Sequence, residues 1–81
     1  MNEDKFYFKT DMQNDIKSIY RLVIDNLNRK VIELIWLNNQ WERTDGLVRM
    51  ITSGEFFLEP VTREQVRRYT PYVDTGAYQS R

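Results

Sequence analysis

The chain has 81 residues, twelve Lys and Arg balanced by twelve Asp and Glu, and neither cysteine nor histidine. This composition excludes disulfides, thiol chemistry and every catalytic group that uses an imidazole. A hydrophobic content of 41% is too high for a disordered chain, and the short length predicts a single domain, residues 1–81, with a small core. An acidic N-terminus and the lack of any long apolar run predict neither a secretory signal nor a membrane span, so the expected location is cytoplasmic.

The N-terminal third of the sequence predicts one strand, followed by a segment that fits either a helix or a strand. Residues 5–9 place three aromatic side chains between two lysines, a pattern that favours a first strand. Residues 15–29 fit two structures. Apolar residues recur at helical spacing, with Asn14 or Asp15 as a cap, yet residues 19–24 are rich enough in β-branched side chains for a strand followed by a turn at 25–28. The apolar positions in question are Ile16, Ile19, Tyr20, Val23, Ile24 and Leu27.

The middle of the chain predicts a β-hairpin. Residues 31–37 are β-branched and aromatic, and residues 40–44 follow after Asn38 and Asn39. Asparagine tolerates the positive φ that both central positions of a type I′ turn require. A two-residue turn places Trp36 opposite Trp41 in a non-hydrogen-bonded pair, where two indole rings can stack. We interpret this pair as part of the core, with an aromatic binding platform as the alternative.

A short helix and another strand are expected next. Thr44 or Asp45 can cap the helix, and Gly54 stands where a left-handed residue ends one. Residues 55–59 then resume a strand pattern, which Pro60 ends or marks as an edge. The apolar helix positions are Leu47, Met50 and Ile51, with Val48 beside them.

The C-terminal part again allows two structures. Thr62 and Gln65 have the spacing of a capping box for a helix. The same residues could instead form a hairpin loop followed by a strand over 65–70. Residues 74–81 are expected to be a flexible tail.

The order of motifs over residues 31–58 resembles a family of small bacterial domains of unknown function. The matching motifs are Val31-x-x-Leu34, Trp41-x-x-Thr44, Val48-x-x-Ile51-x-x-Gly54 and Phe56-Phe57. The resemblance implies a β-β-α-β-β core in which residues 19–25 form the first strand and residues 66–69 lie near the last. It implies no activity. With the N-terminal strand added, the expected fold is α+β, a small single-layer antiparallel sheet packed on one or two short helices.

The sequence offers little to catalysis. Its acidic residues are spread without the spacing of a metal-binding loop, and its three glycines are isolated, so no phosphate-binding loop is present. We therefore predict that the chain is not an enzyme and that it uses no metal and no cofactor.

A cluster near the C-terminus is the candidate partner-binding site. It combines cations with tyrosines, residue types that are enriched where binding energy concentrates. The alternatives are a solvated surface and a nucleic-acid contact, but a neutral chain lacks long-range attraction to a polyanion. The members are Arg63, Arg67, Arg68, Tyr69 and Tyr72.

We therefore predict a non-catalytic interaction or regulatory module that binds a protein partner or itself, as a homodimer. The alternative is a nucleic-acid-associated regulator that uses the same cluster. Eleven aromatic residues are many for so small a core, so some are expected to be exposed or buried against a partner. The candidates are Phe6, Tyr7, Phe8, Tyr69, Tyr72 and Tyr78.

Overall fold

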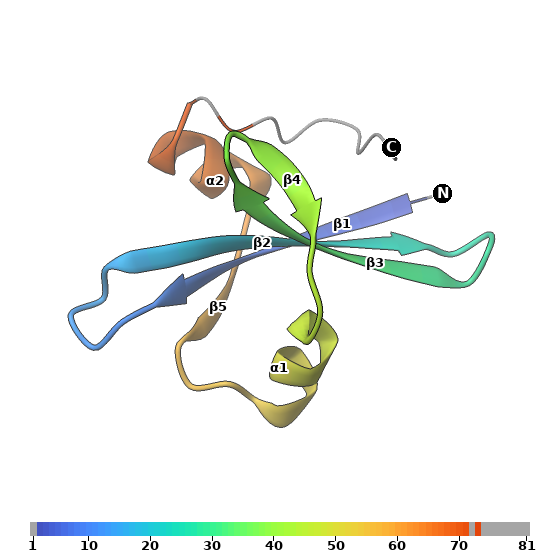
Figure 1. Ribbon diagram of the computed structural model, residues 1–81, viewed down its shortest axis with the longest axis horizontal. Helices are drawn as coiled ribbons and strands as arrows, with labels where there is room; N and C mark the ends of the chain where they lie inside the picture. Colours follow the sequence, from blue (N-terminus) through green and yellow to red (C-terminus); the bar gives the residue numbers. More distant parts are fainter. Residues whose placement is uncertain (1, 72, 74–81) are drawn as a thin grey trace.

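A computed structural model describes residues 2–71 and 73 of the chain (Figure 1). The elements in order are β1 (Asn2–Thr10), β2 (Ile16–Asp25), β3 (Lys30–Leu37), β4 (Gln40–Arg43), α1 (Leu47–Ser53), β5 (Leu58–Val61) and α2 (Arg63–Tyr69). No helix within these described residues has the length and apolar character needed to cross a membrane.

The strands form one antiparallel sheet in the order β4-β3-β2-β1-β5. Figure 1 shows α2 on one face of this sheet and α1 on the other. The predicted α+β class is confirmed, and the helices cover both faces. The β-β-α-β-β core is wrong, because four strands precede α1 and only β5 follows it before the chain becomes helical again.

Alternation along β1 divides the core into two halves. Phe6 and Phe8 pack on one face with Val66 of α2, and Tyr7 packs on the other with Leu47 of α1. Successive side chains of a strand point to opposite faces, so both halves follow directly from the β pattern. Of the six aromatic residues among which some exposed rings were expected, Phe6, Tyr7 and Phe8 are buried, Tyr69 is 51% exposed, and Tyr72 and Tyr78 lie outside the described residues.

Residues 16–25 form the central strand β2, so the helical interpretation of this segment is wrong. β2 pairs with β1 on one side and β3 on the other, and both of its faces are covered. Ile19 and Val23 therefore point to the α2 face, while Leu22 packs on the α1 face. Apolar residues on both faces of a strand produce spacings that match a helix, which explains the ambiguity.

The β3–β4 hairpin agrees with its prediction. Asn38 and Asn39 have φ values of 53° and 61°, as a type I′ turn requires. Trp36 pairs with Trp41, and their ring centroids lie 5.1 Å apart in an edge-to-face arrangement. Both rings are half-buried against the α2-side core, which supports their interpretation as core residues.

The start of α1 differs from its prediction. The cap is Gly46, which has no side chain to accept a hydrogen bond. Thr44 lies two residues before this cap, and its N–H donates to the Glu33 carbonyl at 3.1 Å as an extension of the β3–β4 ladder. Instead, a Glu33 carboxylate oxygen accepts from the Val48 N–H at 2.6 Å. A strand residue thus satisfies a first-turn amide of the helix.

The end of α1 is as predicted, but the next strand starts late. Gly54 has φ 69°, and its N–H donates to the Ile51 carbonyl at 3.2 Å. The first half of the expected strand over 55–59 is a turn. It is closed by a hydrogen bond in which the Leu58 N–H donates to the Glu55 carbonyl at 3.2 Å. Pro60 lies in β5, an edge strand, where a missing N–H is tolerated.

The capping box at the start of α2 is present in full. The Gln65 N–H donates to the Thr62 hydroxyl at 3.1 Å, and the Thr62 N–H donates to the Gln65 side-chain oxygen at 2.8 Å. The helical alternative is therefore confirmed, and the strand over 65–70 is wrong. The expected flexible tail, residues 74–81, lies outside the described residues.

Gly54→Val should lower the free energy of unfolding by about 1–2 kcal/mol, because a β-branched residue is strained at positive φ. A Cβ at this position would meet no atom within 4 Å, so the loss would report backbone strain. Gly54→Asn is the matched control, since asparagine tolerates this conformation better. Equal urea-unfolding midpoints for the wild type and Gly54→Val would contradict the helix end at this residue.

Glu33→Ala should cost about 1 kcal/mol of stability, the usual loss when a helix cap is removed. Glu33→Gln keeps a side-chain oxygen acceptor and should recover part of that loss. Amide hydrogen exchange would locate the effect, with faster exchange expected at Val48. An unchanged exchange rate at that amide in Glu33→Ala would show that the carboxylate does not cap α1.

Candidate functional site

The structure brings three charged residues from distant parts of the chain together. Arg21 of β2 is 1% exposed, and its Nε donates to one Asp4 carboxylate oxygen at 2.9 Å. The other oxygen of Asp4 accepts from Nη2 of Arg63 at 2.9 Å. One carboxylate on β1 therefore binds a guanidinium from the sheet and another from α2.

Aromatic rings complete the surroundings of this cluster. The Arg21 guanidinium carbon lies 5.5 Å from the Phe6 ring centre and 5.7 Å from that of Trp41. The Arg63 guanidinium lies 5.4 Å from the Phe6 ring. These distances are within the range of cation–π attraction. Arg63, one of the predicted partner-binding residues, therefore anchors α2 to the sheet.

Of the other predicted partner-binding residues, three lie on the surface of α2 and one lies outside the described residues. Arg67 and Arg68 are exposed in the last turn of α2, where cations interact favourably with the helix dipole. Tyr69 is 51% exposed, and its ring centre lies 5.7 Å from that of Phe8. Tyr72 lies outside the described residues.

A shallow hollow of about 160 Å³ lies beside Tyr69, between α2 and the start of β2. Its polar groups come from Lys17 and Ser18, and Trp36 supplies an aromatic wall. The Lys17 ammonium lies 3.4 Å from an Asp11 carboxylate oxygen, with its side chain 62% exposed. This hollow is too small and too open to enclose a small molecule.

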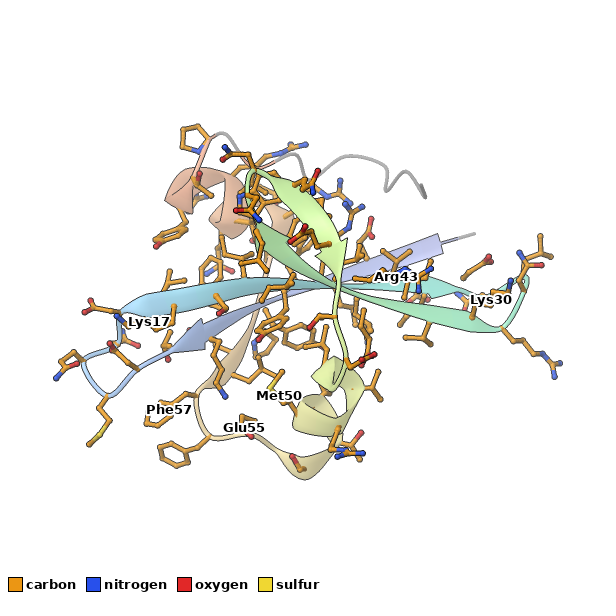
Figure 2. All side chains as sticks on the ribbon, in the orientation of Figure 1. Lys17, Lys30, Arg43, Met50, Glu55 and Phe57 are labelled. Carbon is orange, nitrogen blue, oxygen red and sulfur yellow. The ribbon has the colours of Figure 1, made fainter. Side chains whose placement is uncertain are left out.

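A larger depression lies on the opposite face of the sheet, and we call it the α1–β5 groove. Its volume is about 240 Å³. Figure 2 shows Met50 on α1 and Phe57 on the loop before β5, both on the α1 side of the sheet. The lining is mostly apolar and consists of Tyr7, Met50, Ile51, Gly54, Glu55, Leu58 and Pro60.

The loop at one end of the α1–β5 groove carries an exposed aromatic ring. Phe56 stands between the lining residues Glu55 and Leu58 and is 89% exposed. Its ring packs edge-to-face on Phe57, with 5.1 Å between centroids. Sequence reasoning placed Phe56 in a strand and did not identify it as a surface residue. The Gly54 that ends α1 was the available signal that a loop could follow.

An ion pair lies at the same end of the groove. The Lys9 ammonium and a Glu55 carboxylate oxygen are 2.7 Å apart, with side-chain exposures of 26% and 41%. The pair joins β1 to the loop after α1. It gives the groove one cation and one anion at its rim and therefore no net charge there.

The outer edge of β5 cannot readily accept another strand. The Thr10 N–H donates to the Phe57 carbonyl at 2.9 Å, so Thr10 and Phe57 form a hydrogen-bonded pair. Hydrogen-bonded and non-hydrogen-bonded pairs alternate along an antiparallel ladder. The backbone groups of Leu58 and Pro60 therefore point away from β1. The Leu58 N–H is used by the Glu55 carbonyl, and proline has none. The outer edge of β5 therefore offers outward carbonyls but no unused outward N–H among these residues, which disfavours strand addition and favours binding through side chains.

Asp4→Asn should lower the free energy of unfolding by about 3 kcal/mol, because it leaves the buried Arg21 without its counter-charge. Asp15→Asn is the matched control, since Asp15 is exposed. Chemical denaturation at neutral pH would measure both. Equal losses in the two variants would show that the buried charge cluster contributes nothing specific.

Comparisons of this chain with protein-family models, with curated proteins and with solved structures find no match. The resemblance over residues 31–58 to a family of small bacterial domains therefore stays a prediction. Among the described residues, no group of three or more carboxylates could hold a metal ion.

Proposed function

We propose that this chain is a non-catalytic interaction module of the cytoplasm that binds a protein through the α1–β5 groove. The observation that carries the proposal is Phe56, whose ring is 89% exposed beside an apolar groove. A large apolar side chain next to an apolar hollow is typical of a protein-binding surface.

The size of the groove supports a protein partner over a small molecule. Its volume of about 240 Å³ is below the range of about 300–1,000 Å³ that encloses drug-sized ligands. One or two side chains are the natural occupants of such a hollow. Met50 in its wall is a flexible side chain that adapts to the shape of a partner.

The two carboxyls whose pKa values are lowered, Asp11 and Asp25, lie at turns and outside the groove. Hydrogen bonding from the Asp15 backbone holds the pKa of Asp11 below its ordinary value. The pKa of Asp25 is lowered by hydrogen bonds from the side chain and backbone of Asn28. Both causes are local turn contacts, and neither carboxyl lines the groove. Catalytic acids and bases, in contrast, usually gather in one cleft.

The exposed cations and ring of α2 favour a second candidate, nucleic-acid binding. Arg67, Arg68 and the half-exposed Tyr69 could contact phosphates and a base. Two observations weigh against it. The third arginine of the cluster, Arg63, is held by Asp4, and the sequence pI of about 6.2 is far below that of a dedicated nucleic-acid module.

A photo-crosslinking amino acid at position 56 tests the proposed function. In cells that naturally express the chain, position 56 should form protein adducts, and mass spectrometry would identify them. Position 27 is the matched control, because Leu27 is 82% exposed in the turn between β2 and β3, outside the groove. The same crosslinker at position 68 tests whether a partner binds the surface of α2. Adducts no more frequent at 56 than at 27 would contradict the proposal.

Nucleic-acid binding is expected to be weak. Fluorescence anisotropy with labelled DNA and RNA, over a range of salt concentrations, would measure it. We expect no binding beyond that of a neutral protein of this size. Sub-micromolar affinity would support the second candidate instead, if Arg67→Ala and Arg68→Ala each made the slope of log K against log salt shallower by about 1.

A further inference from the structure

We infer that the α1–β5 groove is occupied by Phe56 of a second copy of this chain, in a two-fold symmetric dimer. The inference rests on the proposed function, because it names the protein that fills the groove. It commits to a contact made by side chains, since the outer edge of β5 offers no unused N–H for strand addition.

Phe56 is the ring that such a dimer would bury. It takes no part in either half of the core, and its ring packs on that of the neighbouring Phe57. A buried phenylalanine removes about 150–250 Å² from water. In the isolated chain, most of that area stays in contact with solvent.

The groove provides an apolar environment for that ring. Tyr7 and Leu58 lie on its sheet side, and Met50 and Ile51 lie on its helix side. An incoming ring would therefore have apolar contacts on two sides. Ion-paired Glu55 and Lys9 remain at the rim, where they can stay hydrated.

The position of the ring relative to the groove favours a closed dimer. A two-fold interface uses the same patch on both copies, so the patch must hold both the inserted group and its receptor. Phe56 lies on the loop that bounds the groove, and a single two-fold operation can place each ring in the other groove. A ring on the far side of the molecule would instead produce an open chain of subunits.

The charges of the patch are also self-complementary. Its rim holds one cation and one anion, Lys9 and Glu55, so a second copy meets both signs and no net repulsion. The chain as a whole has a formal net charge of zero, and neutral proteins associate more readily than highly charged ones.

The area available predicts a weak dimer. A stable interface buries about 800 Å² on each partner, which is a large share of the 6040 Å² accessible surface of this chain. Two rings in two shallow grooves supply less than that area. We expect a dissociation constant on the order of 100 μM, as for a transient association.

Sedimentation equilibrium of the full chain from about 10 μM to 1 mM tests this dimer. The wild type should rise in average mass from 9.9 kDa toward twice that value. Phe56→Ser should stay monomeric throughout, whereas Leu27→Ser, which removes an equally exposed side chain at the other end of β2, should behave as the wild type. Because Phe56 is almost fully exposed, the circular dichroism spectrum of Phe56→Ser should match that of the wild type.

Mixed-isotope crosslinking locates the contact. A photo-crosslinker at position 56 of unlabelled chain, mixed with ¹⁵N-labelled chain, should form adducts to labelled peptides that contain Tyr7, Met50, Ile51 or Leu58. A monomeric wild type at 1 mM would overturn the inference, as would a dimer that persists in Phe56→Ser. If position 56 forms adducts in cells only with a different protein, a second copy of this chain is not what fills the groove. That result would overturn the inference but support the proposed function. No adducts above the position-27 control would contradict both.

Discussion

The charge of Arg21, buried at the centre of the sheet, constrains most of the surrounding structure. A buried guanidinium is strongly unfavourable unless it is paired, and its counter-charge here is Asp4 of β1. A slip of one residue between β1 and β2 would turn the Asp4 side chain to the other face and leave Arg21 without this partner. The second oxygen of Asp4 then holds Arg63. The same carboxylate therefore fixes the register of the two longest strands and the position of α2.

This use of Arg63 changes what the α2 surface can do. A cluster that looks like three cations among tyrosines in the sequence becomes, in three dimensions, one anchor and two cations in the last turn of a helix. Both cations, Arg67 and Arg68, interact favourably with the helix dipole at those positions. An open apolar groove lies on the opposite face, beside α1. The two faces of the sheet thus have different roles, with charge burial on one and an open groove on the other.

Local signals in the sequence predicted local structure well. The Asn38–Asn39 turn, the left-handed Gly54 and the capping box at Thr62 each depend on residues fewer than six positions apart. Contacts between distant residues were not predictable. The carboxylate that accepts from the first turn of α1 belongs to Glu33, fifteen residues before Val48, and the partner of Arg63 is 59 residues away. The strand order has the same cause, because β5 pairs with β1 and not with its neighbours in sequence. Phe56 was missed because residues 55–59 are rich in aromatic and apolar side chains, as strands are, and only the turn closed by Leu58 and Glu55 shows that the first half bends away.

The lengths of the elements explain why a groove remains beside α1. β1 has nine residues and spans about 30 Å, whereas α1 has seven and spans about 10 Å. So short a helix packs on Leu22 and Tyr7 and leaves a depression between itself and the edge strand β5. Gly54 ends the helix there, and the chain must cross the remaining distance as a loop before it enters β5 at Leu58. The early end of α1 therefore opens the groove, and the loop that this end requires carries Phe56 to its rim.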